Sequence, residues 1–260
     1  MFTFNAPKNM LQDKTILITG ASDGIGKCCA ENFVNFGANL ILLGRSQAKL
    51  EKIYDAIEQA HPNKITIHPM NFETASEQDY KILGESLDNQ FSCLDGFIHS
   101  AGKLGDRSPI EFYSVETWNK TIQVNLSSTF LLTKVLLQSL SKSLDARIIL
   151  TSSSVGRKGK ANWGAYAVSK FAIEGLMQTL ADELKNTSNI KINSVNPGGI
   201  KTAMRRAAYP AENPNSQPEP KVLMPFYLYL FSKDTRMIHG EALNFRDFDK
   251  QDFADNASKR

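Results

Sequence analysis

Thr15-Ile-Leu-Ile-Thr19, followed directly by Gly20-Ala-Ser-Asp-Gly-Ile-Gly26, is the stretch that decides the fold. Its first part is a short apolar run, typical of a strand buried on both faces of a sheet. Its second part places three glycines in the turn and at the start of a helix that we expect over residues 24–36. Glycines at such a turn let a pyrophosphate approach backbone N–H groups at the helix N-terminus. The stretch therefore predicts a nucleotide-binding strand–turn–helix unit.

The spacing of the three glycines shows which known nucleotide-binding motifs the turn does not match. Gly20-x3-Gly24-x-Gly26 differs from the common G-x-G-x-x-G, and a P-loop would need Gly and Ser or Thr where the chain has Ala21 and Cys28. A purely structural turn is the alternative interpretation, but the position between a buried strand and a helix favours a nucleotide. The residues that we expect to bind it here are Gly20, Ser22, Asp23, Gly24, Ile25 and Gly26.

The alternation of strands and helices continues along the chain. We expect further strands over residues 39–43, 64–68, 94–98, 147–151, 190–195 and 242–245. We expect helices over residues 47–60, 75–90, 115–144 and 163–185. Such alternation predicts a single α/β domain over residues 1–260, a Rossmann-like, doubly wound parallel sheet of about seven strands with helices on both faces.

One segment interrupts this rhythm. Residues 208–221 carry four prolines among polar residues, within a substrate-loop excursion that we expect near residues 200–221. A mobile flap over a site and a solvated excursion are both open interpretations.

Composition excludes several classes of protein. The 260 residues are 42% hydrophobic and 22% charged with a net charge of +3, which fits a folded globular protein and argues against nucleic-acid binding. The sequence shows neither a membrane-spanning run nor a secretory signal, so we expect a cytoplasmic protein. Three cysteines and four scattered histidines predict no disulfide framework and no metal site.

The end of the second expected strand indicates which nucleotide binds. NAD-binding units place an acidic residue there, on the ribose 2′-hydroxyl. This chain has Leu43-Gly44-Arg45-Ser46, and a guanidinium suits a 2′-phosphate in charge and geometry. Arg45 therefore predicts a preference for NADP(H) over NAD(H), the alternative being a solvated arginine.

Tyr166-Ala-Val-Ser-Lys170 places a phenol and an ammonium on one helix face, where the ammonium should lower the pKa of the phenol. Ser153 lies at the end of the strand over residues 147–151, where it could hydrogen-bond a carbonyl oxygen. The spacing alone proves little, because Tyr229 and Lys233 repeat it with Ser216 placed 13 residues before Tyr229. That second set lies in an apolar run and a proline-rich loop, so we expect it to be structural.

With these residues in place, the chain resembles the short-chain dehydrogenase/reductase family over nearly its whole length. The motifs that carry the resemblance are Thr19-Gly-x3-Gly-x-Gly26, His99-Ser-Ala-Gly102, Asn125, Ser153, Tyr166, Lys170, and Pro197-Gly198 before Thr202. The runs Thr151–Tyr166 and Asn196–Met204 resemble its YciK-like bacterial branch most.

The resemblance implies a role for each residue. Tyr166 would be the general acid in reduction, Lys170 would lower its pKa and bind the nicotinamide ribose, and Ser153 would orient the substrate carbonyl. Asn125 would hold a water that connects Lys170 to solvent. The implied cofactor-binding residues, together with Arg45, are Asn71, Phe72, Ser100, Ala101, Gly102, Tyr166, Lys170, Pro197, Gly198, Ile200 and Thr202.

Three details depart from the family pattern or stay open. His99-Ser100 replaces paired asparagines, so the hydrogen bonds that brace the central sheet must be made differently. Asn71 stands where many members have aspartate. Ser152, Ser153 and Ser154 are consecutive, and spacing favours Ser153.

The resemblance implies an NADP(H)-dependent oxidoreductase that interconverts a carbonyl and an alcohol, mainly as a reductase. A basic loop rim of Arg157, Lys158, Lys160, Lys201, Arg205 and Arg206 suggests an anionic or acyl-carrier-linked 3-oxoacyl substrate, although solvating charges explain it equally. We expect a small-molecule substrate, no nucleic-acid or membrane partner, and a homodimer or homotetramer. The rival interpretation is a catalytically silent NADP-binding scaffold or redox sensor.

Overall fold

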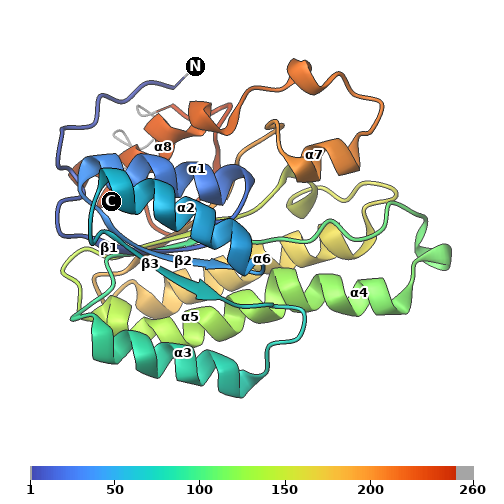
Figure 1. Cartoon of the computed structure of the whole chain (residues 1–260). Coiled ribbons are helices and arrows are strands. Elements are labelled where there is room, and N and C mark those ends of the chain that lie inside the picture. The colour runs from blue at the N-terminus through green and yellow to red at the C-terminus, as the bar shows by residue number, and fades with distance from the viewer. Residues whose placement is uncertain (1, 250–260) are drawn as a thin grey trace.

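The apolar runs of the sequence form the strands of one sheet. In the computed structural model, which describes residues 2–249, these are β1 (Thr15–Thr19), β2 (Asn39–Gly44), β3 (Ile65–Pro69), β4 (Gly96–His99), β5 (Arg147–Thr151), β6 (Lys191–Asn196) and β7 (Ala242–Asn244). Neighbouring strands are parallel, in the order β3-β2-β1-β4-β5-β6-β7 (Figure 1). The predicted seven-stranded, doubly wound sheet is confirmed.

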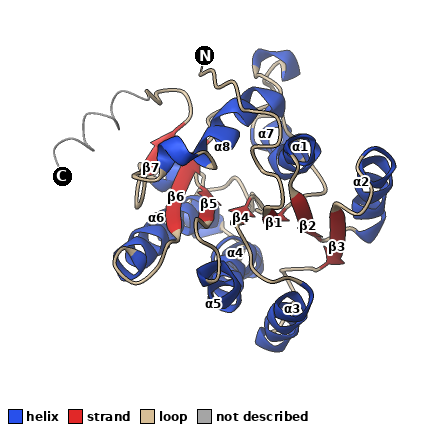
Figure 2. Ribbon diagram, turned by 90° about the vertical axis from the view of Figure 1, so that its left-hand side faces the viewer, coloured by secondary structure: helices blue, strands red, loops and turns tan. Residues whose placement is uncertain are grey.

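Helices cover both faces of the sheet. They are α1 (Gly24–Phe33), α2 (Gln47–Ala60), α3 (Glu77–Gln90), α4 (Val115–Ile122), α5 (Ser128–Ser141), α6 (Gly164–Leu184), α7 (Ala203–Ala208) and α8 (Met224–Leu230). Figure 2 shows α1, α2, α7 and α8 on one side of the strands and α3 to α6 on the other. No helix among residues 2–249 is long and apolar enough to cross a membrane.

Alternation along β1 explains why both faces are apolar. Ile16 and Ile18 pack into the core under α1, α2 and α8, whereas Leu17 packs into the core under α3, α5 and α6. All three side chains are fully buried. A strand buried on both faces reads as a continuous apolar run, which is the pattern of the sequence.

The helix expected over residues 115–144 is the main difference from the prediction. A π-helical turn over Gln123–Ser127 separates α4 from α5, and α5 ends at Ser141. At this turn the Ser128 hydroxyl donates to the Val124 carbonyl and the Thr129 hydroxyl donates to the Asn125 carbonyl. Such π turns frequently occur at functional sites, and this one contains Asn125.

The proline-rich excursion is tied to the body of the protein. The Lys201 amide donates to the Pro218 carbonyl at 2.9 Å, and Lys201 Nζ lies 2.7 Å from a Glu219 carboxylate oxygen. Arg205 forms a two-pronged ion pair with Glu212, at 2.6 and 2.7 Å. The segment therefore folds back over the loop that follows β6.

Candidate active site

A cavity of about 810 Å³ lies beyond the carboxyl ends of the strands. Ligand pockets of roughly 300–1,000 Å³ are usual in proteins. Its walls come from the segments that follow β1, β2, β3, β4, β5 and β6 and from the first turns of α6. The strand order reverses between β1 and β4, and open α/β sheets bind ligands at such a switch point.

The cavity brings together nearly all the predicted site residues. Those that line it are Gly20, Ser22, Asp23, Gly24, Ile25, Arg45, Asn71, Phe72, Ser100, Ala101, Gly102, Ser153, Tyr166, Lys170, Pro197, Gly198, Ile200 and Thr202. Gly26 and Asn125 are not among the residues that line the cavity. Gly26 lies against the Gly20 carbonyl, and Asn125 is hydrogen-bonded to Lys103, which does line the cavity.

The glycine turn is shaped by close backbone contacts. Gly20 has a φ of 64°, and a Cβ there would lie 2.8 Å from the Ala101 amide nitrogen. A Cβ on Gly26 would lie 2.6 Å from the Gly20 carbonyl oxygen, so Gly26 allows α1 to start against the turn. The Thr19 hydroxyl accepts from the Ser100 and Ala101 amides at 3.1 Å, which joins the ends of β1 and β4.

Tyr166 and Lys170 face the cavity from one side of α6. Both are largely buried, at 8% and 3% exposed, and the Lys170 ammonium lies 5.7 Å from the centre of the Tyr166 ring. Lys170 Nζ donates to the Thr151 carbonyl at 2.7 Å, which fixes the ammonium at the end of β5. The predicted pair is thus assembled at the sheet edge.

The pKa of Tyr166 differs from the sequence-based expectation. Burial raises the pKa of Tyr166 to about 12, and hydrogen bonding to the Ser153 side chain opposes that rise. Burial lowers the pKa of Lys170 to about 8, and the charge of Glu174 opposes that change. The predicted lowering of the Tyr166 pKa is wrong for the protein alone, because desolvation dominates. Near neutral pH the phenol carries its proton and Lys170 is mostly an ammonium.

The three consecutive serines have different surroundings. The Ser152 hydroxyl is buried and donates to Glu174 at 2.5 Å, while Ser154 is exposed at the start of a 3₁₀ turn. Ser153 lines the cavity and hydrogen-bonds the Tyr166 side chain. Ser152 also borders the cavity, but its hydroxyl is engaged by Glu174, so of the three serines Ser153 is the one beside the Tyr166 side chain.

Asn125 supports the cavity wall from the π turn. Its Oδ1 accepts from the Lys103 amide at 2.7 Å, and its Nδ2 donates to the Lys103 carbonyl and the Ser169 hydroxyl, both at 2.9 Å. Its side chain therefore joins the segment after β4 to α6.

His99, which stands where the resemblance predicts an asparagine, joins β4 to α5 through Thr129. Its ring is buried, and its Nε2 lies 3.1 Å from the Thr129 hydroxyl. Because that hydroxyl donates its hydrogen to the Asn125 carbonyl at 2.9 Å, the imidazole must donate to the hydroxyl oxygen. Burial, reinforced by the charge of Lys170, lowers the pKa of His99 to about 3, so the ring stays neutral.

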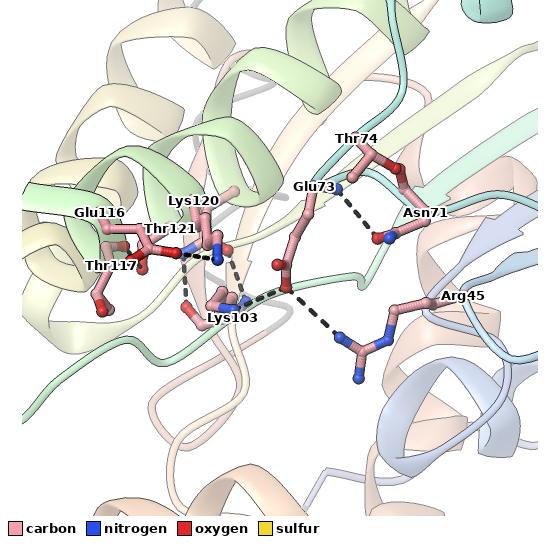
Figure 3. Close-up of polar contacts among 10 residues, drawn as sticks. Arg45, Asn71, Glu73, Thr74, Lys103, Glu116, Thr117, Lys120 and Thr121 are labelled. Carbon is pink, nitrogen blue, oxygen red and sulfur yellow. Dashed lines mark hydrogen bonds and ion pairs between the residues drawn. The ribbon is translucent and has the colours of Figure 1, made fainter.

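Two cations converge on one carboxylate at the side of the cavity formed by the segments after β2 and β3 (Figure 3). Glu73 lies 2.7 Å from Lys103 Nζ and 3.5 Å from Arg45 Nη1. The hydrogen bond from Lys103, with the charges of Lys103 and Arg45, holds the pKa of Glu73 below its usual range. Arg45 is 73% exposed, so its guanidinium can reach a ligand.

The other end of the cavity is apolar and aromatic. The Trp163 ring lies 5.5 Å from that of Tyr166 and 5.9 Å from that of Tyr209, with Leu104 and Met204 packed against them. Trp163, Met204 and Tyr209 line the cavity, whereas Phe112 is exposed and is not part of its wall.

Of the six cations predicted to form a basic rim, three lie beside carboxylates that offset their charge. Lys201 pairs with Glu219, Arg205 with Glu212, and Arg157 points inward to Glu174. Lys158, Lys160 and Arg206 remain exposed at the surface.

The second Tyr–Lys set is structural, as predicted. Tyr229 is buried among the apolar residues of α8, which ends at Leu230, and Lys233 is exposed beyond it. Ser216 lies in a separate exposed turn. Among residues 2–249 there is also no cluster of side chains that could hold a metal ion.

Sequence reasoning missed Glu73, Lys103 and Glu174. Glu174 follows Lys170 by four residues on α6, so its place on the same helix face could have been read from the spacing. Lys103 follows Gly102, but its contact with Glu73 joins residues 30 positions apart.

Comparisons with known proteins agree with this geometry. The family model described as short chain dehydrogenase matches residues 14–213. The chain is 41% identical over 233 residues to the uncharacterized oxidoreductase YciK of Escherichia coli K12, covering 90% of this chain and 92% of that protein. A short-chain dehydrogenase structure from Pseudomonas syringae superposes with a TM-score of 0.91 at 47% identity, over 94% of this chain and 99% of that one. One from Shigella flexneri, in complex with NADP, gives 0.89 at 40% identity, over 92% and 99%.

Proposed function

Since the chain belongs to the short-chain dehydrogenase/reductase family of oxidoreductases, we propose that it reduces a carbonyl substrate to an alcohol with NADPH. The observation that carries this proposal is the position of Tyr166 and Lys170, which face one cavity together with Ser153 and the glycine turn. A nucleotide and a small substrate can both contact that cavity's walls.

The chain fits a dinucleotide at several points. Gly20 lets the turn after β1 pack against the Ala101 backbone, and this turn lines the cavity where a pyrophosphate would lie. An α-helix leaves the N–H groups of its first turn without acceptors inside the helix. At α1 the Gly24 N–H donates to the Asp23 side chain at 2.7 Å, and the amides that follow would face a phosphate. Arg45 would hold the 2′-phosphate, Asn71 and Phe72 would border the adenine, and Pro197–Thr202 would seat the nicotinamide. The complex of the Shigella flexneri relative with NADP supports the same cofactor here.

NADPH, when bound, supplies the hydride. Ser153 would hold the substrate carbonyl oxygen by a hydrogen bond, beside the hydroxyl of Tyr166. Tyr166 keeps its proton near neutral pH because burial raises its pKa to about 12, so it can give that proton to the forming alkoxide. The Lys170 ammonium, fixed on the Thr151 carbonyl, would stabilise the phenolate that remains. A protonated phenol favours the reductive direction.

The substrate class follows from the walls near Tyr166. Trp163, Tyr209, Leu104 and Met204 suit an apolar or aromatic group next to the reacting carbonyl. Because Arg205 is already neutralised by Glu212, it offers less attraction to an anion than its sequence position suggested. We propose a small carbonyl compound with an apolar body. An acyl-carrier-linked 3-oxoacyl chain remains compatible if its phosphate lies over exposed Lys158, Lys160 and Arg206.

We also propose a cytoplasmic homo-oligomer. The cysteines Cys28, Cys29 and Cys93 are free, as is usual in a reducing compartment. Phe130 on α5 and Val168 and Phe171 on α6 are 48%, 46% and 45% exposed. Large apolar side chains exposed on neighbouring helices are typical of a subunit interface.

Tyr166→Phe tests the function directly. Loss of a general acid costs about 10²- to 10⁴-fold in turnover, and we expect a loss of that size across a panel of aldehydes and ketones. NADPH binding, measured by fluorescence titration, should stay close to that of the wild type. Tyr229→Phe is the matched control, because the second Tyr–Lys set lies outside the cavity. A wild type that binds NADPH but reduces nothing in the panel would instead support the silent scaffold.

A further inference from the structure

Glu174 is a buried carboxylate that the proposed chemistry does not use. It lies on α6 one turn beyond Lys170 and is 6% exposed. Its oxygens accept from Ser152 at 2.5 Å at the end of β5 and from Ser194 at 2.6 Å on β6. Arg157 Nε donates to it at 3.2 Å. Glu174 thus joins the catalytic helix to two strands whose ends form the cavity.

Arg157 continues these contacts to the edge of the sheet. Its Nη1 donates to Asn244 Oδ1 at 2.6 Å and its Nη2 to the Leu243 carbonyl at 3.1 Å, both on β7. Asn196 Nδ2 donates to the same Asn244 oxygen at 2.9 Å. Figure 2 shows α6, β6 and β7 together at this end of the molecule.

The last contact reaches the cofactor side of the cavity. Asn196 Oδ1 accepts from the Gly198 amide at 3.1 Å, at the start of the turn that lines the cavity as far as Thr202. An unbroken series of polar contacts therefore runs from Glu174, one helical turn from Lys170, to the turn that would seat the nicotinamide.

We propose that Glu174 and Arg157 are positioning residues that hold the Pro197–Thr202 turn in register with Tyr166 and Lys170. The inference rests on the proposed function, because it assigns the turn to the nicotinamide. A buried ion pair is a poor source of stability, since desolvation offsets most of its attraction. Its directional hydrogen bonds do fix geometry, and hydride transfer is sensitive to geometry: a misplacement of about 1 Å can cost about 100-fold in rate.

Glu174→Gln, Arg157→Met and Asn244→Ala each interrupt the series at a different contact. Asn244→Ala leaves the Arg157–Glu174 ion pair intact, so it still tests the inference if the other two variants fail to fold. Glu183→Gln, an exposed carboxylate on the same helix, is the matched control.

In each of the three variants we expect kcat to fall about tenfold or more. The primary isotope effect with deuterated NADPH should rise as hydride transfer becomes limiting. The NADPH dissociation constant should change little, because the adenosine contacts are untouched, and Arg157→Lys should recover part of the activity.

Unchanged kcat and isotope effect in both Glu174→Gln and Asn244→Ala would overturn the inference, even if their melting temperatures fall, because a purely structural brace predicts that pattern. If the wild type has no turnover, the proposed function fails separately. The fluorescence lifetime of bound NADPH then decides the inference. A lifetime shortened in all three variants supports a loosened nicotinamide, and a lifetime equal to that of the wild type overturns it.

Discussion

Asn125 is hydrogen-bonded to both backbone polar groups of Lys103: its Oδ1 accepts from the amide at 2.7 Å, and its Nδ2 donates to the carbonyl at 2.9 Å. The π turn makes this possible by presenting a fully buried side chain to the segment that follows β4. Because Lys103 also pairs with Glu73, the same amide side chain positions the cation on that carboxylate.

Asn125→Ala should destabilise the protein and slow turnover together. It removes the partners of a backbone N–H and a C=O, and leaving a buried polar group unsatisfied costs about 1–3 kcal/mol. Urea unfolding measures this loss, and steady-state kinetics measures the fall in kcat. Asn119→Ala, at an exposed position on α4, should change neither quantity. A variant with wild-type unfolding free energy would show that the two contacts with Lys103 are dispensable.

Arg45→Ala should weaken NADPH binding selectively. A charge-assisted hydrogen bond is worth about 1.5–3 kcal/mol, which corresponds to a rise of about 10- to 100-fold in the dissociation constant. NADH, which lacks the 2′-phosphate, should bind the variant and the wild type equally. Fluorescence titration with both nucleotides checks this. Equal loss for NADH and NADPH would contradict the assignment of Arg45 to the phosphate.

Glu73→Gln should strengthen NADPH binding at Arg45, the opposite of the effect of Arg45→Ala. The Glu73 carboxylate is 3.5 Å from Arg45 Nη1 and competes with a 2′-phosphate for that guanidinium. Removing its charge should lower the NADPH dissociation constant several-fold and leave that of NADH unchanged. The double variant Arg45→Ala with Glu73→Gln should show no such gain, because the gain acts through Arg45.

The sequence allowed the strands and the Tyr166–Lys170 face to be predicted because each depends on local periodicity. It could not reveal the π turn, since one extra residue per turn barely alters the apolar pattern of residues 115–144. The direction of Arg157 depends on Glu174, in another element, so it was grouped with the surface charges. The pKa of Tyr166 was misjudged for the same reason, because burial is a tertiary property.

Phe171→Asp should convert the proposed oligomer into monomers. Phe171 is 45% exposed on α6, and a carboxylate in an apolar interface has no partner there and must be desolvated. Sedimentation equilibrium measures the mass against the wild type. Leu144→Asp, at a position 89% exposed beyond the end of α5, is the control and should leave the mass unchanged. A wild type that sediments as a monomer would refute the oligomer outright.

The pH dependence of reduction should show an alkaline limb set by Lys170. Burial lowers the pKa of this ammonium to about 8 from a usual value near 10.5. Above pH 8 the positive charge beside Tyr166 is lost, so kcat/KM for carbonyl reduction should decline. Lys170→Arg keeps a cation that does not titrate in this range, so its lower activity should lack the limb near pH 8.

The same shift predicts the sign of the change in folding stability. Between pH 8 and 10.5 the unfolded chain binds a proton at Lys170 that the native protein has released. The free energy of unfolding therefore increases as the pH rises through this range. Below pH 8 both states are protonated and the full cost of burying the ammonium is present. In Lys170→Met the free energy of unfolding should lose this part of its pH dependence. Urea unfolding at about pH 7.5, 8.5 and 9.5 measures it, because the two higher values lie between the native and unfolded pKa of Lys170. An unchanged dependence in the variant would mean that Lys170 is not the group responsible.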